Sequence, residues 1–178
     1  MATVSGLATQ AQGVSCDPVK NASLRMIRPD DRDWLVAKHR TIYAQTDGFD
    51  DSFGDLVAQV LDDFLKTHDP QHECGWIAEE NGHRLGSIFC VRLDAHTAQV
   101  RLFLLVPEAR GKGLGRRMLR RCMRFAQERG YSGMRLWTHQ SHKAACALYK
   151  AQGWRCIEVK PVRSFGQDLI VETYVYPF

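Results

Sequence analysis

The chain has 178 residues, of which 44% are hydrophobic and 25% are charged, as in an average globular domain. This length predicts one domain that buries about 70% of the surface its unfolded chain would expose, so the core needs no disulfide or structural metal. The net charge is only +4, which favours an anionic ligand locally but is too small for a whole-domain nucleic-acid surface. The composition excludes collagen, low-complexity disorder and a disulfide scaffold.

The cysteines and the beginning of the chain indicate where the protein works. None of the six cysteines forms a Cys-x-x-Cys pair or a zinc spacing, which predicts reduced, mostly structural thiols, no metal site and a cytoplasmic location. No run approaches 18 apolar residues, so we expect no membrane span. Residues 1–22 are small and polar and predict a flexible leader, and residues 23–178 predict one domain.

Two amphipathic helices are predicted first. An Asp of Arg28-Pro29-Asp30-Asp31 is expected to cap a helix that carries Trp34, Leu35, Ile42 and Tyr43. Apolar residues between 53 and 65 recur at i, i+3, i+4 and i+7, which places them on one stripe of a second helix. Residues 44–50 between the helices predict a loop or broken turn.

Strand patterns follow. Residues 75–79 and 85–93 flank Asn81-Gly82, which is a strong hairpin signal. A third strand, 98–106, is expected to place Val100, Leu102, Leu104 and Val106 on one face. These three strands predict an antiparallel meander.

The second half of the chain alternates helices and strands. Helices are predicted at 114–129 and 142–152, each ending at a glycine, with a strand at 134–138 between them. The last strands are expected near 154–159 and 169–176. Together these elements predict an α/β (mixed α+β) fold with helices flanking a mixed sheet.

The most informative segment is Arg110-Gly111-Lys112-Gly113-Leu114-Gly115-Arg116-Arg117, between a strand and a helix. Its glycines let the backbone approach a ligand, and the N–H groups at the helix start bind anions, so a phosphate or pyrophosphate fits here. Neither the Walker A pattern nor the dinucleotide fingerprint is present. The alternative is a tight turn with a solvated basic rim.

Two segments resemble the hallmarks of the GNAT family of N-acetyltransferases. The run Leu105-Val106-Pro107-Glu108-Ala109-Arg110-Gly111-Lys112-Gly113-Leu114-Gly115 is similar to the family's acetyl-CoA loop, Arg/Gln-x-x-Gly-x-Gly/Ala, and Ala145-Cys146-Ala147-Leu148-Tyr149-Lys150-Ala151-Gln152-Gly153-Trp154 is similar to Ala-x-x-Leu-Tyr-x-x-x-Gly-Phe. The resemblance implies a mostly antiparallel sheet of about six to seven strands, about four helices, and a fourth strand splayed at the cofactor site. Leu136-Trp137-Thr138 and residues 164–169 resemble the GNAT domains fused to MarR-type regulators, here without the DNA-binding half.

The resemblance also implies roles for individual residues. Backbone groups of Leu104 and Val106 would bind the pantetheine arm of acetyl-CoA, and Tyr149 would protonate the coenzyme A thiolate, unless it is only a packing residue. His142 stands where the family usually has Asn, and it is expected to bind the pantetheine or to act as an acid–base group, unless it is only an exposed residue at the start of the helix. The expected pyrophosphate site consists of Arg110, Gly111, Lys112, Gly113, Leu114, Gly115 and Arg116.

The acceptor and the general base are less defined. Many relatives carry a strand Glu as the base, but this strand offers Gln99 and Arg101. Either another carboxylate acts as the base, with Glu73, Glu79 and Asp168 as weak candidates, or the amine arrives already neutral. The acceptor is expected to lie against the N-terminal helices and their loop, beside residues 139–142 and 164–167. Candidate lining residues there are Tyr43, Gln45, Phe49 and Trp76.

Three functions therefore stay open at this point. The first is an N-acetyltransferase that uses acetyl-CoA, without a metal, and a primary amine of a small molecule, amino acid, peptide or protein. The second is a non-catalytic acyl-CoA-binding regulatory module. The third, a nucleic-acid binder, rests on six arginines between 116 and 129, whose preferred explanation is a solvated helix face. A homodimer is left open.

Overall fold

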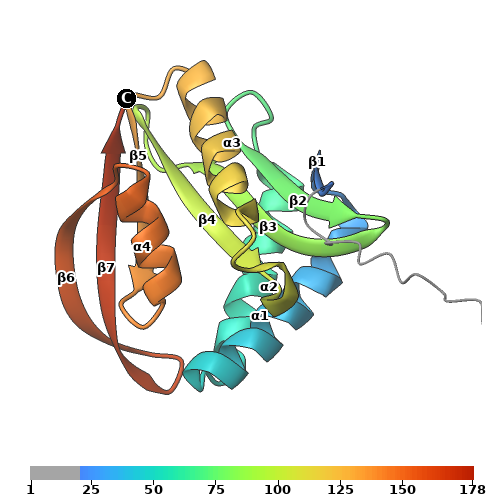
Figure 1. The fold of residues 1–178 in the computed structure, drawn as a ribbon, viewed down its shortest axis with the longest axis vertical. Coiled ribbons are helices and arrows are strands. Elements are labelled where there is room, and N and C mark those ends of the chain that lie inside the picture. Colours follow the sequence, from blue (N-terminus) through green and yellow to red (C-terminus); the bar gives the residue numbers. More distant parts are fainter. Residues whose placement is uncertain (1–20) are drawn as a thin grey trace, which may run out of the picture.

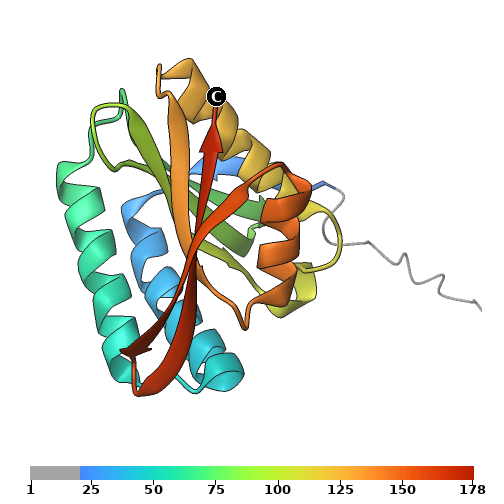
Figure 2. The same ribbon diagram turned by 90° about the vertical axis from the view of Figure 1, so that its left-hand side faces the viewer.

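A computed structural model describes residues 21–178, which form one twisted sheet with two helices on each face (Figures 1 and 2). The strands are β1 (Ser23–Met26), β2 (Cys74–Glu80), β3 (His83–Arg92), β4 (Thr97–Leu105), β5 (Gly133–His139), β6 (Arg155–Ser164) and β7 (Gln167–Pro177). The helices are α1 (Arg32–Asp47), α2 (Asp51–Thr67), α3 (Leu114–Glu128) and α4 (Lys143–Ala151). Short 3₁₀ helices cover Pro29–Asp31 and Pro107–Ala109.

The sheet has the strand order β1-β2-β3-β4-β5-β7-β6, and every neighbouring pair is antiparallel except β4 and β5. Helices α1 and α2 cover one face, and α3 and α4 cover the other (Figure 2). The predicted mixed, mostly antiparallel sheet of the α/β class is confirmed.

Each face of the sheet has its own apolar core. Under α3 the core includes Met118, Leu119 and Cys122, which recur at helical spacing and are fully buried. Under α1 and α2 it includes Leu35 and Leu61. The two cores pack on opposite faces of the same sheet. The sheet therefore fixes the distance between the pair α1 and α2 and the pair α3 and α4.

The N-terminal helices differ from expectation at both ends. The Asp31 carboxylate does not cap α1, because it accepts hydrogen bonds from Arg25, Arg84 and the Arg28 amide instead. The predicted loop at 44–50 is too long, since α1 continues through Asp47 and only residues 48–50 separate it from α2. Strand β1, which pairs with β2, was not predicted because four residues show no clear alternation.

The predicted Asn-Gly turn is present, but the apolar face predicted for β4 is not. Asn81 and Gly82 both have positive φ, 50° and 77°, so the Asn-Gly hairpin is confirmed. On β4 the alternation is broken at Leu102, whose φ is 46°, in the region where the register with β3 shifts. Leu102 therefore packs under α1 and α2, whereas Val100 and Val106 pack under α3, and the single apolar face expected for this strand is wrong.

The expected leader lies outside the described residues, apart from its last two. Asn21 donates its N–H to a Glu80 carboxylate oxygen, and Ala22 is buried with its carbonyl bonded to the Arg117 guanidinium. These two residues therefore belong to the folded part. Among residues 21–178 no helix is long and apolar enough to cross a membrane.

Candidate functional site

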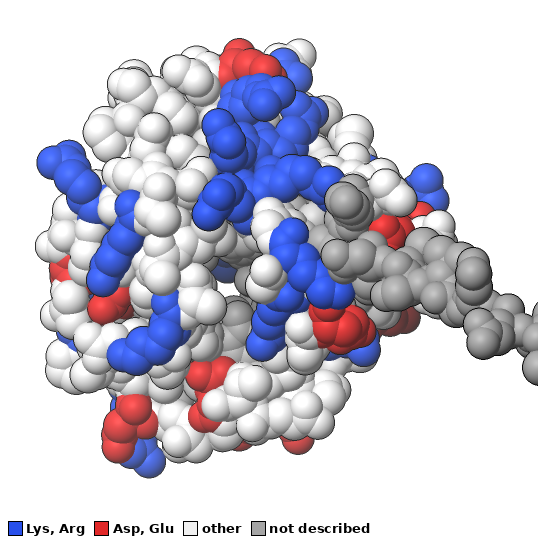
Figure 3. Space-filling model, in the orientation of Figure 1, with Lys and Arg blue, Asp and Glu red and all other residues white. Residues whose placement is uncertain are grey.

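The site begins where β4 and β5 separate. The two parallel strands pair only through residues 97–99 and 133–135, although β4 continues to Leu105 and β5 to His139. Beyond the paired residues the strands diverge, as expected for a splayed fourth strand. Figure 3 shows the surface hollowed on this side of the molecule, between the parts that cover α4 and the glycine loop.

Backbone groups of Leu105 face this opening. The Val106 N–H donates to the Leu85 carbonyl at 3.0 Å, and Leu104 pairs with Ser87 in the same register, so the backbone groups of both residues point toward β3. Alternation directs the Leu105 N–H and carbonyl the other way, and this carbonyl accepts from Arg110 Nε at 3.0 Å. The backbone groups of Leu104 and Val106, which were expected to bind the pantetheine, are thus directed to β3, and those of Leu105 are directed away from it.

The glycine loop ends at the start of α3 beside this edge. Gly111 and Gly113 have φ values of 74° and 81°, and a Cβ at either would meet nothing within 4 Å, so open space lies next to the loop. The first α3 hydrogen bond runs from the Arg117 N–H to the Gly113 carbonyl. The amides of residues 114–116 thus have no acceptor inside the helix, which is the arrangement that binds a phosphate.

Tyr149 approaches the opening from α4. Its ring centroid lies 6.4 Å from that of Phe103 on β4 and 5.6 Å from that of Tyr174 on β7. The side chain is buried, and burial raises the pKa of the phenol well above its usual value, so it is fully protonated at neutral pH. The charge that Tyr43 would carry if ionised is a second, smaller cause of the raised pKa of Tyr149.

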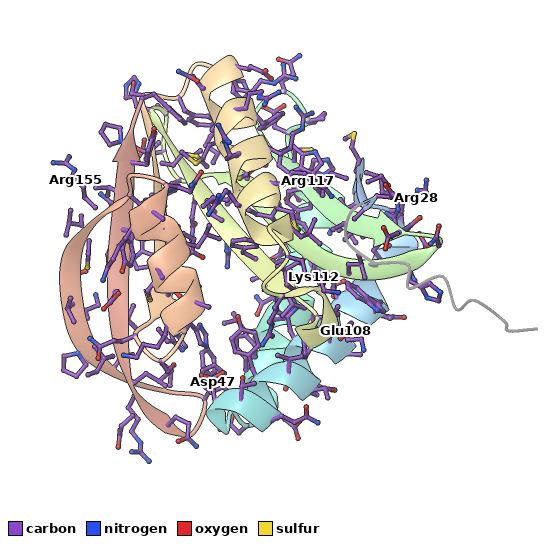
Figure 4. The ribbon with its side chains drawn as sticks, in the orientation of Figure 1. Arg28, Asp47, Glu108, Lys112, Arg117 and Arg155 are labelled. Atoms are coloured by element: carbon purple, nitrogen blue, oxygen red, sulfur yellow. The ribbon has the colours of Figure 1, made fainter. Side chains whose placement is uncertain are left out.

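A carboxylate and an imidazole meet on the other side of the opening. Asp47, at the end of α1, accepts from Ser141 Oγ at 3.1 Å and lies 3.0 Å from Nε2 of His142, which precedes α4. Burial alone would raise the pKa of Asp47, but hydrogen bonds from Thr46, the charge of His142 and the bonds from His142 and Ser141 lower it. Figure 4 shows Asp47 at the end of α1 that faces α4.

A second histidine adjoins this pair. The His139 ring stacks on that of His142, with centroids 5.2 Å apart, and its Nδ1 is buried without a hydrogen-bond partner among the described residues. Burial, and then the charge of His142, lower the pKa of His139. Sequence reasoning missed Asp47 because it predicted a loop there; a helix continued through residue 47 places it one turn after Tyr43 on the same face.

Aromatic rings gather where α1, α2 and the β6–β7 turn meet. Tyr43, Phe49 and Phe53 contact one another, and Phe165 of the β6–β7 turn lies 5.1 Å from Phe49 and 5.0 Å from Phe53 by ring centroids. Burial, followed by the charge of Asp47, raises the pKa of Tyr43 to about 12. The expected lining residues Tyr43 and Phe49 are therefore gathered in one wall.

The other two expected lining residues lie elsewhere. Gln45 is exposed and two residues from Tyr43, which places it on the opposite side of α1. Trp76 is buried under α3, where its ring meets Phe125 at 5.3 Å and the Arg121 guanidinium at 5.5 Å. Trp76 is thus a core residue of the other face.

The weak candidates for the general base are engaged away from the opening. Glu73 accepts the backbone N–H groups of Asp69 and Arg92. Glu79 is paired with Arg25 next to β1, and the exposed Asp168 is paired with Arg163. None of these three carboxylates lies with the Asp47–His142 pair.

The basic residues of α3 form an exposed stripe. Its buried face carries Met118, Cys122 and Ala126, as the helical spacing predicted, and the arginines lie outside (Figure 3). Figure 4 shows Lys112 at the glycine loop and Arg117 on the neighbouring helix. Basic side chains therefore surround the expected pyrophosphate position. Within residues 21–178 no group of His, Cys, Asp or Glu could hold a metal ion.

Comparison with known proteins decides the family. The model described as the acetyltransferase (GNAT) family matches residues 32–154. The chain belongs to the GNAT acetyltransferase family. This GNAT chain is 31% identical over 104 residues to N-acetyltransferase family 8 member 3 of Rattus norvegicus, which covers 56% of the chain and 44% of the relative. It thus spans less than half the length of that relative.

Further similar proteins include N-acetyltransferases by name. N-acetylaspartate synthetase of Danio rerio is 32% identical over 87 residues, covering 48% of this GNAT chain and 31% of the relative. The crystal structure of ribosomal-protein-alanine N-acetyltransferase from Brucella melitensis superposes with a TM-score of 0.72 at 18% identity, over 88% of this chain and 99% of that one. Spermidine N-acetyltransferase from Vibrio cholerae, in complex with CoA and spermine, gives 0.69 at 16% identity, over 88% and 95%. These structures confirm the GNAT fold.

Proposed function

We propose that the protein transfers an acetyl group from acetyl-CoA to a primary amine by direct attack in a ternary complex. The observation that carries this proposal is the opening between β4 and β5, which has the Tyr149 phenol on one side and the Asp47–His142 pair on the other. Such an arrangement offers an acid for the leaving group and a base for the nucleophile.

Acetyl-CoA fits the residues beside the opening. The unpaired amides of residues 114–116 and the side chains of Arg110, Lys112 and Arg116 suit the pyrophosphate, and Gly111 and Gly113 leave room for it. The Leu105 N–H suits the pantetheine arm or the thioester carbonyl. In this assignment His142 moves from the expected cofactor site to the acceptor side, since its Nε2 is bonded to Asp47.

The transfer then needs two proton movements. The amine nitrogen attacks the thioester carbon, its proton passes to Nδ1 of His142, and the Leu105 N–H stabilises the oxyanion of the tetrahedral intermediate. When the carbon–sulfur bond breaks, the sulfur takes the Tyr149 proton, which solvent or His142 restores. The products are an amide and the free thiol. Asp47 orients the His142 ring through the hydrogen bond to Nε2, which leaves Nδ1 to take the proton.

Replacement of the acid tests this mechanism. We expect Tyr149→Phe to lower kcat by roughly 10²- to 10⁴-fold, since a general acid contributes that much, with an unchanged Kd for acetyl-CoA. Thiol release with a panel of amines measures kcat, and calorimetry measures Kd. The matched control is Tyr176→Phe, because Tyr176 packs on Trp154 beyond the opening. Equal turnover in both variants would remove Tyr149 from the mechanism.

The same panel tests the activity itself. Binding of acetyl-CoA without thiol release for any amine would favour the non-catalytic acyl-CoA-binding module, which the Gln99 and Arg101 positions on β4 also suit. Loss of binding in Gly113→Glu is expected, because its side chain would enter the open space beside the loop. Absence of acetyl-CoA binding by the intact protein would contradict both functions.

A further inference from the structure

Two arginines of the central strands have no partner within residues 21–178. Arg101 on β4 is half-buried, and neither it nor Arg135 on β5 forms a hydrogen bond or ion pair with the part of the chain that the structure describes. Nε of Arg135 is also buried without a hydrogen bond. Burial lowers the pKa of Arg101, yet a guanidinium stays charged at neutral pH. The two strands therefore hold two guanidinium groups that no described residue contacts through a hydrogen bond or an ion pair.

The two side chains lie on the same face of the sheet. Met134 and Leu136 pack under α3, so Arg135 between them faces the side of α1 and α2. Gln99 pairs with Arg135 across the strands and lines a cavity under α2 together with Arg101. Gln99 thus adjoins Arg135 across the sheet and Arg101 along β4. We call these three residues the arginine corner.

A cavity of about 210 Å³ opens beside this corner. It lies between the second half of α2 and strands β3 and β4, and Leu102, at the bulge of β4, also lines it. Asp63, His68, Glu73 and Arg92 also line it. Arg92 is paired with Asp69, Glu73 accepts two backbone N–H groups, and Nδ1 of His68 lies 2.8 Å from the Phe64 carbonyl oxygen. Asp63 is exposed, and within residues 21–178 it forms no ion pair with Arg101. The space is large enough for a small polar group with its hydration.

Two unpaired arginines at this depth are costly for the folded protein. Removal of a guanidinium from water without a hydrogen-bonding partner lowers stability, and no contact within the described residues offsets that loss. An incoming carboxylate would offset it, because the planar guanidinium binds carboxylates with two parallel hydrogen bonds. The arrangement therefore suits a ligand better than a structural role.

We propose that the arginine corner binds the carboxylate of the acceptor, so that the acceptors are amino acids or other amines that carry a carboxylate. This inference rests on the proposed acetyl transfer. Arg101 precedes Leu105 by four residues on the same strand, or about 13 Å along β4. The carboxylate is accordingly held at the corner while a long, extended acceptor presents its amine at the opening.

Matched pairs of acceptors test the proposal. Each ω-amino acid of a series of increasing length is compared with the alkylamine of the same length, using thiol release with saturating acetyl-CoA. We expect the carboxylate to raise kcat/KM by about 10- to 100-fold in the longer pairs, as charge-assisted hydrogen bonds do. In Arg101→Gln and Arg135→Gln we expect that preference to be lost through KM, while kcat for the alkylamines stays unchanged.

Two controls separate recognition from stability and from net charge. Arg124→Gln removes one positive charge from the exposed face of α3 and should keep the preference. The melting temperature of Arg101→Gln should equal or exceed that of the parent protein, because an unpaired buried charge is removed. Arg101→Lys, which keeps a charge, should retain part of the preference.

Each outcome bears on a different proposal. Equal kcat/KM for the two members of every pair, or a preference that survives both substitutions, overturns the arginine corner while leaving acetyl transfer intact. If no amine is acetylated although acetyl-CoA binds, acetyl transfer fails. The corner is then measured directly by calorimetry of ω-amino acids on the CoA-loaded protein. Equal binding by parent protein and Arg101→Gln would overturn it there as well.

Discussion

Substitution of Asp31 should reveal how strongly the N-terminal helices are held to the sheet. Its fully buried carboxylate accepts from Arg25 Nη1 at 2.7 Å, Arg25 Nη2 at 2.8 Å, Arg84 Nε at 2.6 Å and the Arg28 N–H at 2.7 Å. Although burial would raise its pKa, these bonds lower it from 3.8 to about 2. Since one pKa unit corresponds to about 1.4 kcal/mol, ionised Asp31 contributes about 2 kcal/mol to the free energy of unfolding.

We expect Asp31→Asn to lower that free energy by at least about 2 kcal/mol at pH 7, because two arginines also lose their shared partner. The pKa is depressed on folding, so the contribution is complete well above pH 3.8 and is lost as the pH falls through about 2. The gap between parent and variant should therefore shrink to roughly half at pH 3. Urea denaturation followed by circular dichroism at pH 7, 5 and 3 measures it.

The control is Asp33→Asn, whose carboxylate is 91% exposed beside Arg32 and should change stability by less than about 0.5 kcal/mol. Two results would refute the reasoning. One is a difference in the free energy of unfolding between parent protein and Asp31→Asn of less than about 0.5 kcal/mol at pH 7. The other is a difference that is the same at pH 7 and pH 3.

Three further predictions concern His39, Gly86 and Cys156. His39 is buried with Nδ1 bonded to the Leu35 carbonyl, and burial lowers its pKa from 6.5 to about 4. Because the unfolded chain binds the proton at a higher pH than the folded protein does, the free energy of unfolding falls as the pH drops from about 6.5 to 4. We expect His39→Phe to remove up to about 3 kcal/mol of that pH dependence in urea denaturation, and parallel profiles would contradict it. In Gly86→Ala the new Cβ would clash with the Leu104 carbonyl oxygen. We therefore expect the free energy of unfolding to fall by about 1–3 kcal/mol and acetyl-CoA to bind more weakly. The control is Gly82→Ala, whose Cβ would have no atom within 4 Å and which should keep the parent Kd for acetyl-CoA. Cys156 is exposed, while the other four described cysteines are buried. In a Cys16→Ser background a thiol reagent should therefore label Cys156 alone rapidly. Rapid labelling that persists after the further substitution Cys156→Ser would contradict this.

The sequence predicted those parts of the site that depend on local backbone chemistry. Asn81-Gly82 and the loop from Gly111 to Gly113 were identified because residues at positive φ are restricted in type. The order of helices and strands followed from periodicity, and the splayed strand followed from the family resemblance.

Features that depend on register could not be predicted. The bulge at Leu102 moves the β4 side chains relative to simple alternation, and it is produced by pairing with β3, which no local pattern encodes. The direction of the Leu104 and Val106 backbone groups toward β3 could not be predicted for the same reason, since the direction of an amide depends on its partner strand. Asp47 and Arg135 became visible only when distant segments were brought together.

The contact between the β6–β7 turn and the α1–α2 loop has a consequence for how the molecule matures during synthesis. Asp50 donates its N–H to the Phe165 carbonyl at 3.1 Å, and Gln167 donates its side-chain amide to the Gly48 carbonyl at 2.9 Å, across 119 residues of chain. Because a ribosome delivers the chain from its N-terminus, the glycine loop and α3 emerge well before Phe165. A nascent chain can therefore assemble the half that suits the acetyl donor first. The aromatic wall of Tyr43, Phe49, Phe53 and Phe165 is completed only when the final hairpin docks, so an unfinished protein lacks the surface on which we propose that the amine binds.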